Sequence, residues 1–228
     1  MSDVVSEANP NGKRPEDRLP IRILQLVDTL FARVYHDLTV ISPQCLPRKG
    51  PAILICNHIN SIDPVFLQAS IHHRLITWMM AQEYMSLTGL GWFFRTIGII
   101  PVARSGRDTG PLRAALRELQ AGRIIGIFPE GRIAETDELL PFQTGVALMA
   151  IKTGVPVYPA YIEGSQRGRD MMTAMLSRCE ATVAYGPPVQ FDRHSGTGRA
   201  QLEGATAAMR TAILQLRDQT LAHLADRR

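Results

Sequence analysis

A histidine and an aspartate separated by four residues, His58 and Asp63, form the strongest chemical signal in the sequence. They follow the apolar run Ala52–Cys56, which is typical of a buried strand, and Pro64 comes directly after the aspartate. A carboxylate bonded to one imidazole nitrogen fixes the tautomer and stabilises the imidazolium, which leaves the other nitrogen as a general base. The plain alternative is that Asp63 only caps the next helix and that His58 is a polar loop residue.

Charged side chains also follow two later strand-like runs. The segment Gly98–Val102 leads to Arg104, and the segment Phe128–Arg132 follows a second apolar run. The residues of interest in the latter are Glu130, Gly131 and Arg132. Arginine binds phosphate with planar, bidentate geometry, although a solvated loop arginine or a salt-bridged turn would have the same sequence. A base with basic groups at neighbouring strand ends is what acyl transfer to a phosphorylated alcohol requires.

The sequence offers no partner nucleophile for such a base. Ser105, Ser165 and Ser195 all lack the glycine two positions earlier that a GxSxG nucleophile turn requires. We therefore expect the base to activate the hydroxyl of the substrate itself, without a covalent enzyme intermediate. There is no HExxH zinc motif, and the side chains of the adjacent His72 and His73 should diverge into solvent.

Strand-like and helical segments alternate along the chain. The expected strands are Ala52–Cys56, Leu75–Ala81, Ile99–Val102, Ile124–Phe128, Val155–Ile162 and Ala181–Tyr185. The expected helices are Pro64–His72, Pro111–Gln120, Thr144–Lys152 and Gln201–Ala225. This alternation predicts one α/β domain with a mostly parallel central sheet flanked by helices. Because Val155–Pro159 contains two prolines, we expect that strand at a sheet edge or with a bulge.

The N-terminal region divides into two parts. Residues 1–18 are polar and are expected to form a disordered leader, and residues 19–45 should contain an amphipathic helix before the main domain of residues 46–228. Apolar residues recur at helical spacing between positions 20 and 38. We expect this apolar face to pack on the protein's own domain, with an interfacial membrane anchor as the alternative.

Composition narrows the class of protein and its location. The chain has 228 residues, 45% of them hydrophobic and 20% charged, with a formal net charge of +4. This mild positive charge suits anionic membranes or phosphorylated ligands, while the lack of a dense basic run with aromatics argues against nucleic acid. The three cysteines are widely spaced, which favours a reducing cytoplasm. No apolar stretch is long enough to span a bilayer, so any membrane contact should be at the surface.

Four blocks of sequence, taken together, resemble the glycerophospholipid acyltransferase family, which includes the 1-acyl-glycerol-3-phosphate acyltransferases. The blocks are Asn57-His58 with Asp63, Gly98–Arg104, Phe128–Arg132 and Val155–Pro159. The resemblance implies an acyl thioester donor on coenzyme A or acyl carrier protein, with no bound cofactor. It also implies a lysophospholipid acceptor and peripheral attachment to the inner face of the membrane.

The same resemblance assigns roles to individual residues. His58 would act as the base and Asp63 would orient it. The substrate-binding residues would be Asn57, Arg104, Glu130, Gly131 and Arg132.

The third block departs from the usual family pattern. Arg132 follows Gly131 directly, where Glu-Gly-Thr-Arg is usual, and Gln143 stands where lysine is frequent. This form of the block is closer to the acyltransferase half of the 2-acylglycerophosphoethanolamine acyltransferases, so the acceptor headgroup stays open. Two other functions also stay open: a non-catalytic lipid-binding or membrane-remodelling module, and a hydrolase that releases acyl groups to water.

Overall fold

The computed structural model describes residues 19–86, 91, 94, 97–103, 109–168 and 170–227. Its strands form one sheet in the order β1-β7-β6-β2-β5-β3-β4. Their bounds are β1 Thr39–Val40, β2 Ala52–Cys56, β3 Ile76–Ala81, β4 Ile100–Val102, β5 Ile124–Ile127, β6 Val157–Glu163 and β7 Thr182–Tyr185. Strands β2 to β6 run parallel, whereas β7 pairs antiparallel with β6 and parallel with β1. The predicted mostly parallel α/β fold is confirmed.

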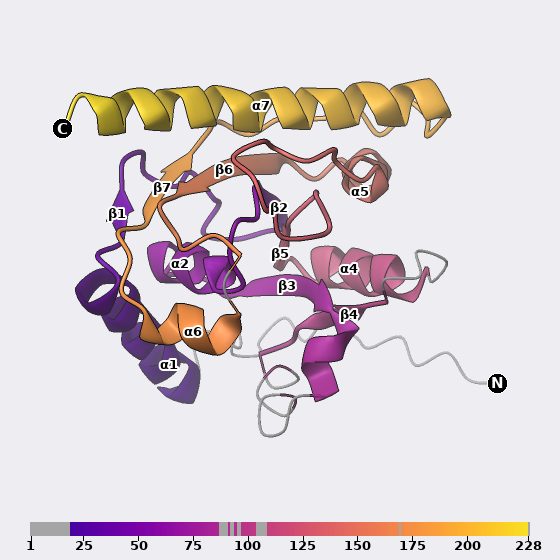
Figure 1. Ribbon diagram of the computed structural model, residues 1–228. Helices are drawn as coiled ribbons and strands as arrows, with labels where there is room; N and C mark the ends of the chain where they lie inside the picture. The colour runs from indigo at the N-terminus through magenta and orange to yellow at the C-terminus, as the bar shows by residue number, and fades with distance from the viewer. Residues whose placement is uncertain are drawn as a thin grey trace.

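Helices cover both faces of this sheet (Figure 1). Their bounds are α1 Leu19–Leu30, α2 Asp63–Ser70, α4 Gly110–Gln120, α5 Gly145–Thr153, α6 Met171–Leu176 and α7 Arg199–Ala225, with a π-helical turn at Phe31–Tyr35 and a 3-10 turn at Gln82–Ser86. One core layer lies under α4, α5 and α7, and the other under α1, α2 and α6. The central strand β2 is fully buried, because helices cover the sheet on both faces. Its side chains are accordingly apolar on both faces.

The strand that was predicted to contain two prolines and to lie at an edge is β6, which contains only Pro159 and lies inside the sheet, contrary to the prediction. β6 lies between β7 and β2, and its register with β2 runs without interruption from Val157 to Ala160. The carbonyl of Pro159 accepts a hydrogen bond from the backbone N–H of Gly186, at 2.9 Å. The N–H that proline lacks would point to the same side, where β7 has already ended at Tyr185. The sheet therefore loses no strand-to-strand hydrogen bond at this proline.

The N-terminal helix is present, but the expectation that its apolar face packs inward is wrong. Its inward side instead carries Ile21 and Gln25, and the amide of Gln25 donates to the carbonyl oxygen of Arg74 at 3.4 Å. The large apolar residues of α1 and the following turn that are exposed are Leu19, Ile23, Leu26, Val27, Leu30 and Val34.

Helix α6 extends this exposed apolar face. Met172, Met175 and Leu176 are exposed, and the hydroxyl of Tyr35 donates to the carbonyl oxygen of Leu176 at 2.5 Å, which ties the two segments together. We call the exposed apolar residues of α1, the π-helical turn and α6 the apolar surface. A contiguous apolar surface of this kind marks a site of interaction with a protein or a membrane.

The protonation of Asp28 on α1 tests whether this side of the helix is buried. Burial raises the pKa of its carboxyl to about 7, and its Oδ2 atom has no hydrogen-bond partner among the described residues. The folded state therefore binds the proton more tightly than the unfolded chain, whose ordinary aspartate pKa is 3.8. A raised folded pKa means that the wild-type protein gains stability as the pH falls from about 7 toward 3.8.

We predict that Asp28→Asn increases the free energy of unfolding above pH 7, because the amide removes a poorly solvated charge. The gain should shrink as the pH falls below about 7, where the wild-type carboxyl becomes protonated. Urea unfolding across this pH range measures the difference. Asp226→Asn, at the exposed end of α7, is the control and should show no such trend. A pH-independent difference for Asp28→Asn would contradict the buried position of this carboxyl.

Candidate active site

His58 and Asp63 meet at the carboxyl edge of the sheet. β2 ends at Cys56, the chain turns through His58, and α2 begins at Asp63. The imidazole Nδ1 lies 3.0 Å from the Asp63 Oδ2 atom. The aspartate side chain is fully buried, whereas the histidine side chain is 16% exposed. The pair thus has a buried carboxylate and a ring that reaches the surface, as a base with its orienting group requires.

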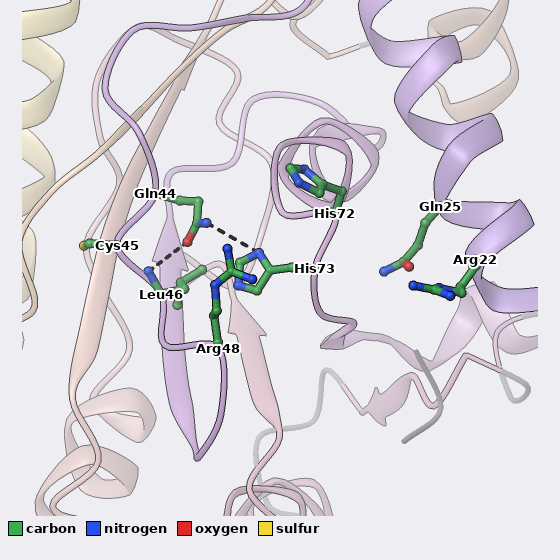
Figure 2. Close-up of a pocket in the computed structure, with 8 residues that line it drawn as sticks. All are labelled: Arg22, Gln25, Gln44, Cys45, Leu46, Arg48, His72 and His73. Carbon is green, nitrogen blue, oxygen red and sulfur yellow. Dashed lines mark hydrogen bonds between the residues drawn. The ribbon is translucent and has the colours of Figure 1, made fainter. Parts of the chain in front are cut away.

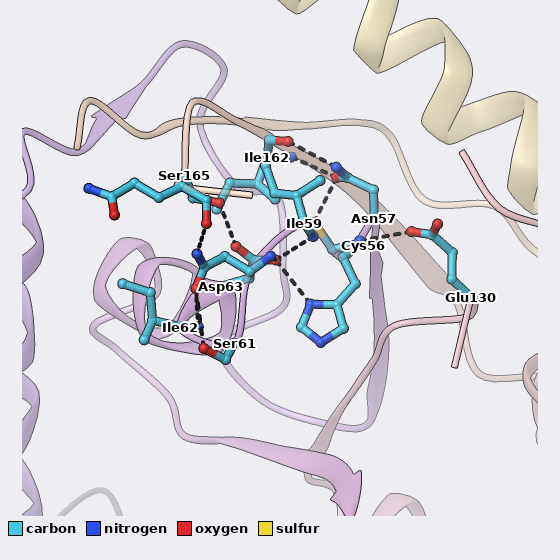
Figure 3. Close-up of polar contacts among 12 residues, drawn as sticks. Cys56, Asn57, Ile59, Ser61, Ile62, Asp63, Glu130, Ile162 and Ser165 are labelled. Carbon is cyan, nitrogen blue, oxygen red and sulfur yellow. Dashed lines mark hydrogen bonds and ion pairs between the residues drawn. The ribbon is translucent and has the colours of Figure 1, made fainter. Parts of the chain in front are cut away.

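Asp63 is not the helix cap that the sequence suggested. The cap position is Ile62, Asp63 is the first helical residue, and its carboxylate points back into the preceding loop. Its Oδ2 atom accepts the backbone N–H groups of Ile59 and Asn60, each at 2.8 Å, and its Oδ1 atom accepts the hydroxyl of Ser165 at 2.8 Å (Figure 3). The loop between the two catalytic candidates is therefore wrapped around the carboxylate.

This hydrogen-bond pattern determines the tautomer of His58. A carboxylate oxygen that already accepts two backbone N–H groups acts as an acceptor, so the ring nitrogen facing it, Nδ1, carries the hydrogen. The other nitrogen, Nε2, then holds a lone pair. It makes no hydrogen bond with any described residue, and it is free to take a proton from a bound hydroxyl.

Aromatic stacking holds the plane of the His58 ring. Phe128, just after β5, stacks on it with centroids 4.0 Å apart, and Trp78 stacks on the other side of Phe128 at 5.1 Å. The backbone of Gly126 makes room for this stack, because a Cβ atom at that position would lie 2.5 Å from the Trp78 side chain. Stacked rings of this kind stabilise one orientation by about 0.5–1.5 kcal/mol per pair.

Glu130 supports the backbone around the base. Its side chain is 4% exposed. Oε1 accepts the backbone N–H of His58 and Oε2 that of Leu140, each at 2.8 Å. Burial raises the pKa of this carboxyl, and the two N–H donors oppose part of that rise. The structure thus places Glu130 beneath the histidine, and its predicted contact with a substrate hydroxyl stays a prediction.

Asn57 ties the end of β2 to β6. Its amide nitrogen donates to the carbonyl oxygen of Ile162 at 2.9 Å, and its amide oxygen accepts the Ile162 N–H at 2.8 Å. The side chain is buried, at 3% exposure, so it extends the strand pairing by one residue beyond β2. Its predicted role in substrate binding is likewise untested.

The remaining predicted binding residues lie on the turn after Glu130. Gly131 has a φ of 72°, a conformation that favours glycine, and Arg132 beside it is exposed. Arg132 forms no ion pair with a described residue. The same turn returns to the site, since the N–H of Ala134 donates to the carbonyl oxygen of His58 at 2.7 Å. Arg104 lies outside the described residues.

The sequence did not predict three residues of the site. Ser165 is a hydrogen-bond partner of Asp63, and Phe128 and Trp78 form the aromatic stack on the His58 ring. Ser165 follows the end of β6, as His58 follows β2, so the rule that parallel strands end at one edge could have found it. Trp78 had no such signal. Its contact with Phe128 depends on the pairing of β3 with β5, in which it lies opposite Gly126.

Comparison with known proteins gives a family match that includes this site. The sequence model of the acyltransferase family matches residues 37–163, more than half of the chain. The matched range contains His58, Asp63 and the Glu130–Arg132 turn.

Individual relatives agree with the family match. A 1-acyl-sn-glycerol-3-phosphate acyltransferase of Bacillus subtilis is 24% identical over 181 residues, which are 79% of this chain and 88% of that protein. An N-acylphosphatidylethanolamine synthase of Arabidopsis thaliana is 26% identical over 170 residues, 65% of this chain and 59% of the relative. The matched part of this chain spans 41%, 37% and 40% of the length of three other curated relatives.

A solved structure shows the same fold. The crystal structure of the 1-acyl-sn-glycerophosphate (LPA) acyltransferase PlsC from Thermotoga maritima superposes with a TM-score of 0.70 at 19% sequence identity. The similarity covers 93% of this chain and 85% of that one. The two chains therefore share the same overall fold.

We predict that Asp63→Ala lowers the free energy of unfolding by about 3 kcal/mol or more, because each buried donor left without an acceptor costs about 1–3 kcal/mol. Ser165→Ala removes only one donor, and the carboxylate keeps its two backbone partners, so its cost should be about 1–2 kcal/mol. Urea unfolding of both variants gives the comparison. Equal costs for the two variants would show that the carboxylate does not organise the loop.

Proposed function

The chain belongs to the acyltransferase family, and from this premise we propose that it transfers a fatty acyl group from a thioester to a lysophospholipid. The donor would be acyl coenzyme A or acyl carrier protein, and the first candidate acceptor is the free hydroxyl of 1-acylglycerol-3-phosphate. The observation that carries the proposal is the buried Asp63 carboxylate on Nδ1 of His58, with Nε2 left to act as a base.

The reaction would proceed in one displacement at the thioester carbonyl. Nε2 of His58 takes the proton of the acceptor hydroxyl as that oxygen attacks the carbonyl carbon, and the C–S bond then breaks. The thiolate leaves and receives the proton from the imidazolium. Asp63 stabilises the imidazolium while it exists, and the face of the Phe128 ring adds a favourable contact with a cation.

The hydrogen bonds around the pair support transfer without an acyl-enzyme. A covalent mechanism needs a nucleophilic hydroxyl or thiol bonded to the base. Ser165, the hydroxyl in this network, donates to the Oδ1 atom of Asp63, on the other oxygen from the ring. Among the described residues no hydroxyl or thiol is bonded to Nε2, so the substrate's own hydroxyl is the natural nucleophile.

The turn after Glu130 carries the residues that would contact the acceptor headgroup. Arg132 is exposed and offers a permanent positive charge beside the site, which suits a phosphate. An acceptor of the 2-acylglycerophosphoethanolamine type is the second candidate. It is favoured by the uncharged Gln143, whose side chain packs 3.6 Å from where a Cβ of Gly131 would be, and by the name of the Arabidopsis relative.

Attachment to the membrane surface follows from the same substrate class. Within the described residues no helix is long and apolar enough to cross a bilayer. The apolar surface instead offers exposed leucine, isoleucine, valine and methionine side chains from α1 and α6. We propose that this face rests in the headgroup region on the cytoplasmic side, where soluble thioester donors are available.

The proposal predicts acceptor-dependent thiol release from an acyl thioester, together with a new diacyl product. His58→Ala should lower the rate by about 10²–10⁴, the typical contribution of a general base. His194→Ala, in an exposed loop, is the matched control and should keep wild-type activity.

The assay uses a panel of lysophospholipids that includes lysophosphatidate and lysophosphatidylethanolamine, with thiol and lipid products followed in parallel. Thiol release that yields only free fatty acid would indicate a hydrolase instead. Substantial turnover by folded His58→Ala protein would refute the mechanism, and folded protein that is silent across the panel would favour the lipid-binding module.

A second prediction concerns the headgroup. Arg132→Ala should raise the KM for a phosphate-bearing acceptor about tenfold or more with a smaller change in kcat, since a charge-assisted hydrogen bond contributes about 1.5–3 kcal/mol. Arg199→Ala, an exposed arginine on α7, is the control. An unchanged KM would place the phosphate site elsewhere.

A further inference from the structure

A pocket lies just beyond the C-terminal end of α2, at the opposite end of this helix from Asp63 (Figure 2). It has a volume of about 650 Å³ and is open to solvent on one side. Arg22 and Gln25 reach it from α1, Gln44 and Arg48 from the segment before β2, and His72 and His73 from the turn after α2 (Figure 2). His72 is exposed as expected and His73 is half-buried, and both line this pocket.

The electrostatic character of this pocket is positive. Arg22 and Arg48 carry permanent charge, and no aspartate or glutamate is among its described lining residues. Burial lowers the pKa of His73, and the neighbouring His72, Arg48 and Arg74 lower it further. Nearby positive charge disfavours the charged form of an imidazole, so this shift agrees with the positive character of the pocket.

The hydrogen bonds of Gln44 reveal how His73 faces the pocket. The backbone N–H of Leu46 donates to the Gln44 side-chain oxygen at 2.9 Å, so the amide nitrogen of Gln44 faces Nδ1 of His73 at 3.5 Å. An amide nitrogen can only donate, so Nδ1 accepts and Nε2 carries the hydrogen. That Nε2 atom is buried and has no hydrogen-bond partner among the described residues. This unpartnered N–H group therefore lies below the surface of the pocket, in a residue that lines it.

The apolar surface adjoins this pocket. Arg22 lies three residues after Leu19 and four before Leu26, so on a helix it neighbours both of these exposed side chains. The same helix therefore presents an apolar face and, at its border, one wall of a basic pocket. If the apolar surface rests in a bilayer, its border with the pocket lies at the depth of the lipid phosphates.

We propose that this pocket binds the phosphate group of an anionic phospholipid, with Arg22 and Arg48 facing the phosphate oxygens and His73 beside them in the wall of the pocket. The site is separate from the acceptor site, because it lies beyond the opposite end of α2 from Asp63. It deepens the proposed membrane attachment by naming the lipid chemistry that the attachment prefers. The pocket would orient the protein on anionic membranes.

The test is binding of the full chain to vesicles of phosphatidylcholine, alone or mixed with phosphatidylglycerol, which is anionic and is not a lysophospholipid. We expect Arg22→Gln combined with Arg48→Gln to weaken binding to the anionic vesicles about 10- to 30-fold, at about fivefold per arginine near a membrane surface. Binding to phosphatidylcholine alone, which reports on the apolar surface, should not change. The control, Arg199→Gln with Arg227→Gln, removes the same charge from the first residue of α7 and from the turn just after its end. Helix α7 lies on the other face of the sheet, so this control should change binding less than about twofold.

A second measurement identifies the source of the phosphate. Inorganic phosphate is titrated while the ring signals of His73 are followed by NMR, in the wild-type protein and in Arg22→Gln. A loss on anionic vesicles supports the lipid headgroup. A His73 response to phosphate without a vesicle effect supports a soluble phosphate compound and overturns the lipid assignment.

If His73 does not respond and the double variant binds vesicles as the α7 control does, the site is refuted. The single variant Arg22→Gln, on the exposed side of α1, keeps the test valid if the double variant does not fold. These readouts do not depend on turnover. A failure of the acyltransferase proposal would therefore leave this result unaffected, and turnover of a detergent-dispersed acceptor should be the same in the pocket variants as in the wild type.

Discussion

The buried carboxylate of Asp63 is the constraint on which the site depends. A charge removed from water is stable only when hydrogen bonds replace its hydration, and here the donors are the N–H groups of Ile59 and Asn60, the imidazole of His58 and the hydroxyl of Ser165. Three of these come from the loop after β2 and one from the loop after β6. Satisfying one carboxylate therefore shapes a loop, orients a ring and joins two strand ends.

Two other buried side chains, Glu130 and Asn57, hold the backbone around the site by hydrogen bonds. Glu130 holds the His58 N–H from the end of β5, and Asn57 holds Ile162 on β6. Because β2, β5 and β6 are parallel neighbours, their carboxyl ends lie at one edge, and polar side chains there can reach one another. The histidine is thus fixed on its backbone side by Glu130, on its edge by Asp63 and on its face by Phe128. A ring held in this way is already oriented before a substrate binds, as the proposed base requires.

Helix α1 shows a second constraint, because a polar residue of this helix is buried and forms a hydrogen bond in the protein interior. Gln25 faces inward and bonds to the carbonyl of Arg74, whose guanidinium in turn donates to the carbonyl oxygens of Pro47, Gly50 and Gly122. The apolar residues are left outside, where a bilayer offers them a better environment than water. The candidate active site lies at one end of the small helix α2 and the basic pocket lies at the other end, and α1 with its exposed apolar residues packs beside α2.

Six of the seven strands, the mostly parallel sheet and the pairing of His58 with Asp63 could be predicted from the sequence, because each depends on local apolar runs or on a short loop, whereas the two-residue strand β1 was missed. The sequence also determined the family, through blocks that need no knowledge of contacts. Four features came from the three-dimensional structure alone. Asp63 points back into the preceding loop, Ser165 and Trp78 support the site, a proline-containing strand lies inside the sheet, and α1 exposes its apolar face. These features depend on strand order, on register and on which side of a helix has a hydrogen-bond partner, and such long-range contacts leave no periodic trace in the residues that make them.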